Sequence, residues 1–364
     1  MSKTARRDGQ QFNPQALWVA RNYVGLAVSQ LAAEADISRA LISAYENGSE
    51  KPGPLALGAL AAVLNFPQAF FFRELEVPAR DAMHFRKKKK VAEYVVSRAR
   101  AKATVAGVTR EALEEFADFD PPKLPYRNAR APEAIEKAAE EVRSALGLRL
   151  DTPLGDAIRT CEAAGVFVAT FDALGAPIDG FAYWSRGVPV IMLNAAACWS
   201  RRRFSVLHEL GHLTLHRDEI PDDKEDQANR FAGALLIPRA AFWREFPRPG
   251  RRYFDWAYLI EMKKRWGVSI QAIVVRARDL GLLDAAQYRT ALIHISQVGW
   301  RTSEPAEMEP ESPAVGARLL EAVSSHFGAD SVAAAASLRP SVLGDVVGFH
   351  PVAEQEISKI HKIY

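Results

Sequence analysis

Cysteines and long apolar runs are both scarce in this chain. The only cysteines among its 364 residues are Cys161 and Cys198, which excludes a disulfide-stabilised scaffold and a metal site made of thiolates alone. No apolar run approaches the roughly 18 residues that a membrane-spanning helix requires. The first residues, MSKTARRDGQQF, are polar and lack the apolar core of a secretory signal. We therefore expect a cytoplasmic protein that does not insert into a membrane.

A strong charge of either sign is also missing. The 47 basic and 44 acidic residues give a net charge of +3, so the overall charge favours no class of partner. No segment of about 20–50 residues repeats. The hydrophobic content of 48% and the charged content of 25% are ordinary for a globular protein, and the length predicts two or three domains. Functional signals must therefore come from local motifs.

The first segment, residues 1–77, has the pattern of short helices separated by turn signals. Helices are expected at 30–35 and 38–46, with a tight break between them, and this is the spacing of a helix-turn-helix unit. Ser29 and Ser38 are expected to cap the N-termini of these two helices. The segment is therefore predicted to be a small helical domain.

The next stretch, residues 78–128, differs in composition. Eight Lys and Arg residues lie between Arg86 and Lys102 against a single Glu, and a proline-rich break follows at 121–126. We interpret the stretch as a basic helical linker. Its basic run is either a solvated helix face or a footprint that adds phosphate contacts to the preceding domain. Self-cleavage within the linker is a further hypothesis.

Residues 129–290 are predicted to combine helices with a few short strands. Two helical segments precede runs rich in β-branched residues at 165–171 and 188–194. The segment between these runs, 180–184, is expected to pair with both of them. Helical patterns then continue to about residue 290. The prediction is a fold of the α+β class that is mostly α, with a small sheet.

The last region, residues 291–364, carries the weakest patterns. It contains an acidic, proline-rich loop at 303–313, an alanine-rich helical pattern, and a segment at 341–349 with the composition of a strand. We expect this region to act as a sensor or as a surface that binds a partner.

His208, Glu209 and His212 form the motif HExxH within a predicted helix. Residues i and i+4 lie about 6 Å apart on one helix face, so two imidazoles can bind one Zn²⁺ at about 2.0–2.1 Å. Glu209 lies one step round the helix, where its carboxylate can take a proton from water that the metal activates. The spacing therefore predicts a zinc site with a general base.

A catalytic zinc site needs a third protein ligand and an open position. Glu225 is the leading candidate, because it opens the next predicted helix after a short polar turn. Asn229, one turn later, is expected to hydrogen-bond a ligand imidazole. His216 continues the i+4 series but lies too far along the helix to share the ion, so we expect it to pack or to support a ligand. The other candidates are acidic residues near Glu225: Asp218, Asp222, Asp223 and Asp226.

These segments resemble a known family. RRRFSVLHELGHLTLH at 201–216 and EDQANRFAGALLIP at 225–238 closely resemble the ImmA/IrrE metallopeptidases, and the similarity extends over about 130–310. The resemblance implies a compact gluzincin-like core, in which the two motif histidines and Glu225 bind zinc and the motif glutamate is the base. It also implies a narrow substrate range, namely repressor-type transcription factors whose cleavage relieves repression under stress or during prophage induction.

Peptide hydrolysis also requires a group that stabilises the oxyanion. Several residue types can donate the necessary hydrogen bond, and the sequence leaves the choice open. The candidates are Tyr183, His216, Tyr253 and His294.

The N-terminal domain resembles the XRE/Cro-type repressor domains. Residues 29–52 have that family's Gln early in the second helix, Ser at the start of the recognition helix, and Glu-Asn-Gly at its end. The resemblance implies that the recognition helix enters the major groove of double-stranded operator DNA. A homodimer would present two such helices to two half-sites. The domain could instead bind protein.

The residues expected to touch DNA lie on the second and third helices. Arg39 is the long donor suited to guanine, and Gln30 is expected to contact backbone phosphate. The complete predicted set is Gln30, Ser38, Arg39, Ala40 and Ser43.

Three functions remain open at this point. The first is a DNA-binding, zinc-dependent endopeptidase that cleaves a repressor-type protein. The second is a repressor, or the antitoxin of a toxin–antitoxin pair, that grips its partner without cutting it. The third is a structural zinc site, closed by four protein ligands, that holds a helical sensor. Cys161 or Cys198 could supply the fourth ligand, although neither has the usual ligand spacing.

Overall fold

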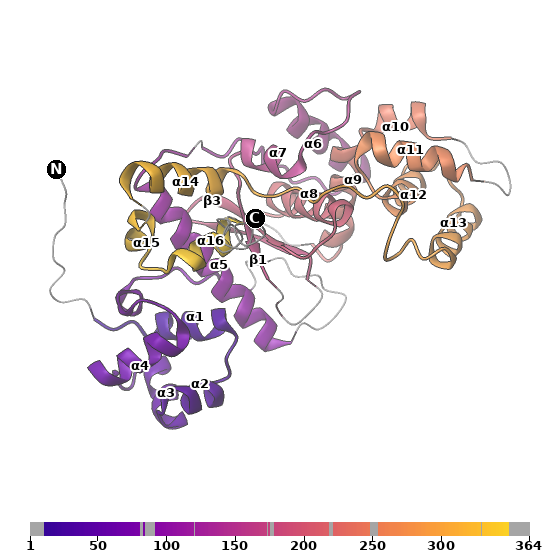
Figure 1. The fold of residues 1–364 in the computed structure, drawn as a ribbon. Helices are drawn as coiled ribbons and strands as arrows, with labels where there is room; N and C mark the ends of the chain where they lie inside the picture. Colours follow the sequence, from indigo (N-terminus) through magenta and orange to yellow (C-terminus); the bar gives the residue numbers. More distant parts are fainter. Residues whose placement is uncertain are drawn as a thin grey trace, which may run out of the picture.

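The computed structural model describes residues 11–80, 83, 92–119, 121–172, 174, 178–217, 221–247, 254–328 and 330–348. Helices dominate these residues, and one three-stranded sheet lies near the centre (Figure 1). Helices α1–α4 form a group at one end, and α10–α13 lie at the other (Figure 1). Within the described ranges, every helix is too short or too polar to cross a membrane. The fold is thus mostly helical around a small sheet, as predicted.

The N-terminal group is a bundle of five short helices. They are α1 (Pro14–Val24), α2 (Val28–Ala35), α3 (Arg39–Asn47), α4 (Pro54–Leu64) and the 3₁₀ helix η1 (Gln68–Phe72). Ser38 caps α3 as expected, since its hydroxyl accepts a hydrogen bond from the amide of Leu41 at 3.2 Å. The expected cap at Ser29 is wrong, because α2 begins at Val28. There the side-chain oxygen of Gln30 accepts a hydrogen bond from the amide of Ala27 at 2.7 Å and does the capping.

Helix α5 (Glu93–Glu114) joins this bundle to the rest of the chain as part of the core. Its basic residues face α1: the ammonium of Lys102 lies 3.7 Å from the ring centroid of Tyr23, and the guanidinium of Arg100 lies 5.2 Å from that of Trp18. In the part of the basic run that the structure describes, these side chains therefore hold α5 against the N-terminal bundle and do not form a solvated face. The basic residues at 86–90 lie outside the described residues.

The sheet contains β1 (Phe167–Phe171), β2 (Gly180–Ser185) and β3 (Val188–Asn194) in the order β1-β3-β2. β1 runs parallel to β3, and β2 runs antiparallel to it. The expectation that β2 pairs with both other strands is wrong. A two-residue turn with positive φ at both residues, Arg186 and Gly187, forces β2 beside β3, and the apolar β3 takes the centre.

Alternate residues of each strand enter two different cores. Phe181 and Tyr183 of β2 face the core that contains α5, whereas Ala182 between them faces the core that contains α8 (Trp199–Leu215). β1 and β3 alternate in the same way. The sheet therefore separates α5 from α8, as the two-residue period of a strand requires.

The core on the α8 side is built from helices that follow one another along the chain. They are α6 (Pro132–Ala145), α7 (Ala157–Ala163), α9 (Lys224–Leu236), α10 (Arg239–Glu245), α11 (Trp256–Trp266), α12 (Ile270–Asp279) and α13 (Ala285–Gln297). α9 packs along α8 and also against α6 and α12. A buried ion pair between Glu136 of α6 and Arg276 of α12, at 2.5 and 2.7 Å, fixes the helices that flank α9.

The C-terminal helices return to the other side of the sheet. They are α14 (Val315–Phe327), α15 (Ser331–Ala336) and α16 (Pro340–Val347), and they pack against α5 and β1. The strand expected at 341–349 is wrong, because most of this segment is helix α16. Val342, Leu343, Val346 and Val347 recur with helical spacing and are all buried. The hydroxyl of Thr170 in β1 donates a hydrogen bond to the carbonyl of Asp345 at 2.7 Å.

The acidic loop at 303–313, named here the acidic strap, makes specific contacts with helix starts. Three of its four glutamates accept hydrogen bonds from backbone amides in the first turns of three helices, where carboxylates are favoured by the helix dipole. The pairs are Glu304 with Ile270 of α12 at 2.8 Å, Glu307 with Ser200 of α8 at 3.2 Å, and Glu311 with Ala157 of α7 at 2.9 Å. The strap also buries Lys263 of α11, whose ammonium lies 2.9 Å from Glu304.

Candidate metal centre

Helix α8 presents His208 and His212 on one face and packs closely against α9. Gly211 permits this close packing. A Cβ atom built at Gly211 would lie 3.1 Å from Cδ1 of Phe231 and 3.3 Å from Cα of Ala228 on α9. The glycine of the motif therefore lets α9 approach closely enough for Glu225, in its first turn, to reach the two histidines.

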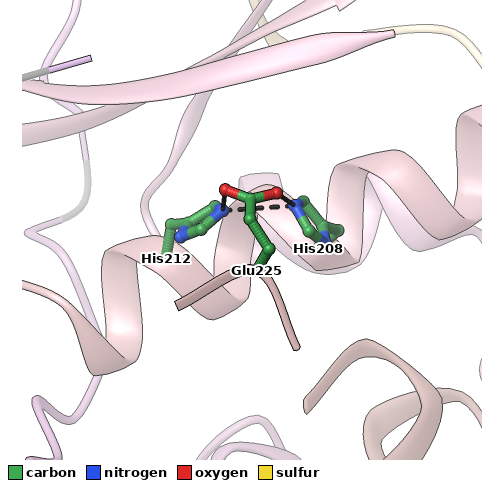
Figure 2. Close-up of side chains that lie close together, drawn as sticks. All are labelled: His208, His212 and Glu225. Carbon is green, nitrogen blue, oxygen red and sulfur yellow. Dashed lines mark hydrogen bonds and ion pairs between the residues drawn. The ribbon is translucent and has the colours of Figure 1, made fainter. Parts of the chain in front are cut away.

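Three side chains converge beside α8 (Figure 2). Nε2 of His208 lies 3.1 Å from Nε2 of His212, and these atoms lie 3.5 Å from Oε2 and Oε1 of Glu225, respectively. A tetrahedron with bonds of about 2.0–2.1 Å has edges of about 3.3–3.4 Å. The separation of the two nitrogens, and the distance from each of them to the nearer carboxylate oxygen, are therefore close to the edge length of a tetrahedral zinc site.

The side chains of this group are almost fully removed from solvent. His208, His212 and Glu225 are each less than a tenth exposed. Two imidazoles and one carboxylate form the donor set typical of a catalytic zinc site, which leaves one position for water or substrate. The chemistry and the spacing of the three residues both fit zinc.

Glu209 lies next to this group without being one of its three members. It is buried, and the start of β2 lies against it, since a Cβ atom at Gly180 would be 3.5 Å from Cγ of Glu209. Its carboxylate is therefore next to His208 in sequence and is enclosed between α8 and the start of β2.

The other candidate ligands lie elsewhere. Asp223 and Asp226 are exposed at the start of α9, Asp222 is exposed in the preceding turn, and none of the three joins the group. Asp218 lies outside the described residues. Neither cysteine belongs to the group found among the described residues. Among the residues that the structure describes, the group therefore has three members and no fourth protein ligand of the kind that a closed structural site would use.

His216 contacts His212, which is one of the two arrangements expected for it. Its Nδ1 lies 2.9 Å from Nδ1 of His212, on the side away from Glu225, and its Nε2 lies 3.0 Å from Oε1 of Gln227. Burial lowers the pKa of His216, although its hydrogen bond with Gln227 opposes the shift. Asn229 is half-buried, and the described residues show no hydrogen bond between it and the imidazole of His208 or His212, contrary to expectation. The sequence pattern did not indicate Gln227.

Two of the oxyanion candidates have structural contacts instead. The hydroxyl of Tyr183 donates a hydrogen bond to the carbonyl of Ala103 at 2.8 Å, on the α5 side of the sheet, and burial raises its pKa. His294 stacks on Trp256 with ring centroids 4.2 Å apart. His216 lies behind His212, and Tyr253 lies outside the described residues.

The helix-turn-helix residues form an exposed surface of the N-terminal bundle. Ile42 and Tyr45 of α3 are buried and anchor the helix. Arg21 of α1 binds Glu46 of α3 through two hydrogen bonds, at 2.6 and 2.9 Å, so this arginine serves the bundle itself. The five residues expected to contact DNA are all exposed: Gln30, Ser38, Arg39, Ala40 and Ser43.

Comparison with known protein families finds both parts of the chain. Residues 20–67 match the helix-turn-helix family, and residues 161–278 match the IrrE N-terminal-like domain, a peptidase family. These matches confirm the two resemblances in the expected order. The second match includes all three residues of the candidate metal group and Glu209. No curated protein matches the chain.

Proposed function

We propose that the chain is a DNA-binding transcriptional regulator that carries a zinc-dependent endopeptidase centre. One observation supports this proposal most strongly. Two imidazole nitrogens and one carboxylate lie 3.1–3.5 Å apart, next to a second acidic residue that is not part of the group. The match to a peptidase family supports hydrolysis of peptide bonds, and the match to a helix-turn-helix family supports binding to DNA.

The roles of the chain's own residues follow from their positions. A zinc ion held by His208, His212 and Glu225 would supply Lewis acidity that activates water and polarises a peptide carbonyl. Glu209 would accept the proton of the attacking water on its carboxylate and then deliver it to the leaving amine. Exclusion of solvent by the surrounding side chains strengthens these charge interactions.

The proposed substrate is a repressor-type protein whose cleavage relieves repression in a stress or prophage response. This part rests on the resemblance to the ImmA/IrrE metallopeptidases. The competing proposal is a non-cleaving repressor or antitoxin that binds DNA and a partner protein through the same two domains. The two proposals differ in one measurable respect, which is whether Glu209 is needed once the metal is bound.

Zinc content is the first test. We expect one zinc per chain in the purified protein, and loss of zinc in His212→Ala and Glu225→Ala. Asp226→Ala is the matched control, because Asp226 is an exposed carboxylate next to Glu225. The metal centre is refuted if the reconstituted wild type holds no zinc, or if Asp226→Ala loses as much zinc as Glu225→Ala.

Glu209→Gln separates the two functions. The peptidase proposal expects this variant to keep zinc but to cleave no member of a library of purified repressor-type proteins, with products of the wild type mapped by mass spectrometry. Unchanged DNA binding and partner binding, with no cleavage by the wild type either, would favour the non-cleaving regulator.

A further inference from the structure

A continuous series of hydrogen bonds extends from the back of the candidate metal group to the surface. It starts with Nδ1 of His212 and Nδ1 of His216, 2.9 Å apart. Nε2 of His216 lies 3.0 Å from Oε1 of Gln227, and Nε2 of Gln227 donates to Oδ1 of Asp223 at 2.9 Å. The first three side chains belong to buried residues, and Asp223 is exposed. The series links the end of α8 to the start of α9.

Simple proton counting assigns each donor in this series. Nε2 of His212 faces His208 and Glu225, so it must carry a lone pair there to bind a metal ion. The single ring proton of His212 is then on Nδ1, which donates to Nδ1 of His216. His216 must therefore carry its own proton on Nε2, which donates to the carbonyl oxygen of Gln227. The amide of Gln227 in turn donates to the carboxylate of Asp223.

Every hydrogen bond in the series thus points away from the metal group and ends on a carboxylate. The reverse direction would place a proton on Nε2 of His212, where it would block the metal. When one nitrogen of an imidazole donates to a fixed acceptor, the plane of the ring is fixed and the other nitrogen becomes more basic. The series is therefore suited to both the tautomer and the orientation that a metal ligand needs.

We propose that His216, oriented by Gln227 and Asp223, is a positioning residue that holds His212 in the tautomer and ring orientation required to bind zinc. This inference rests on the metal centre proposed above. It assigns His216 no contact with substrate or with the ion, and no role in proton transfer during catalysis.

The test is the zinc affinity of the full-length protein, measured by competition with a chromophoric chelator. His216→Phe keeps the ring but removes the acceptor, and we expect zinc to bind roughly 10–100-fold more weakly. His216→Asn restores an acceptor at the position of Nδ1 and should recover part of the affinity. His326→Phe is the matched control, because His326 is exposed on α14, and it should bind zinc like the wild type.

A second variant and a second readout separate positioning from packing. Gln227→Met keeps the side-chain volume but removes the acceptor for His216, and we expect a smaller loss of affinity that is measurable even if His216→Phe fails to fold. In zinc-loaded wild type, proton–nitrogen NMR should show a protected Nδ1–H on His212, and Gln227→Met should weaken its protection.

The possible results distinguish the two proposals. If the wild type binds no zinc, the metal centre itself fails. If the wild type binds zinc and the folded His216→Phe and Gln227→Met variants bind it equally well, the positioning role is overturned while the metal centre stands. Weakened binding with partial recovery in His216→Asn supports the positioning role.

Discussion

Gly211→Ala tests whether the close packing of α8 and α9 sets the geometry of the candidate metal centre. The added methyl group would lie 3.1 Å from a ring carbon of Phe231 and 3.3 Å from Cα of Ala228. Both distances are shorter than ordinary carbon–carbon contacts, and the second partner is backbone that cannot rotate away. α9 must therefore move by a few tenths of an ångström, and Glu225 moves with it.

Two opposing energies decide the effect of Gly211→Ala on stability. Replacing a glycine inside a helix by alanine stabilises that helix by about 0.8–1.0 kcal/mol. Adding a methyl group to a well-packed contact costs about 1–3 kcal/mol. We expect the packing cost to outweigh the helix gain, with a net loss of up to about 2 kcal/mol in the free energy of unfolding. The displacement of Glu225 should weaken zinc binding about tenfold, at the lower end of the effects seen when ligand support is altered.

Gly107→Ala on α5 provides the matched control. Gly107 is also inside a helix, but a Cβ atom there would meet its nearest neighbour, Oγ of Ser185, at an ordinary distance of 3.6 Å. This variant should be more stable than the wild type by up to about 1 kcal/mol and should bind zinc normally. Urea unfolding of the metal-free proteins and chelator competition measure the two effects. If Gly211→Ala is as stable as Gly107→Ala and binds zinc like the wild type, the reasoning about this contact is refuted.

Three further predictions concern other parts of the chain. Glu136→Ala leaves the buried guanidinium of Arg276 without its carboxylate partner, although the carbonyl of Ile237 still accepts from it. The variant should lower the free energy of unfolding by about 3–5 kcal/mol in urea titrations; a loss under about 1 kcal/mol would contradict this. Arg39→Ala should cost about 1–3 kcal/mol in discrimination between bases at one position, so duplexes selected from a random pool should lose the preference for guanine there. An unchanged selected sequence would exclude Arg39 from base contacts. Burial opposes ionisation of Glu307, but its hydrogen bonds with Lys263 and with the amide and hydroxyl of Ser200, together with the charge of Lys263, outweigh this and lower the pKa of Glu307 below its ordinary value of 4.5. The ionised form is thus the stabilising one, so the difference in stability between wild type and Glu307→Gln should be constant above about pH 5 and should shrink as the pH falls below about 4.5; a difference that grows toward low pH would reverse the assigned sign.

Short motifs made the local features of this chain predictable. The spacing of HExxH depends only on the helix period, so the placement of His208 and His212 on one face could be derived from sequence. The cap at Ser38 follows from the same kind of local chemistry. Glu225 required one additional assumption, that two helices joined by a short turn pack together, and the structure places it in the group.

Features that depend on partners distant in sequence were harder to predict. Lys102 and Arg100 belong to a basic run, but their cation–π partners lie about 80 residues earlier in the chain. The acidic strap has the composition of a solvated loop. Nothing in its local sequence shows that its glutamates contact the first turns of particular helices. The segment 341–349 contains β-branched residues, a composition that favours a strand. These residues recur at helical spacing, and it is this spacing that agrees with the structure.

The packing of α1 on α5 determines where the metal group lies when the N-terminal bundle is seated on DNA. Because the bundle, α5 and one face of the sheet share a continuous apolar core, and α8 packs on the other face of the same sheet, we expect α3 and α8 to turn together. Operator DNA completes a turn in about 10–10.5 base pairs. Moving a binding site by about five base pairs would therefore carry the candidate metal group to the opposite side of the duplex. The position of the operator would thus set the side of the DNA on which this group lies.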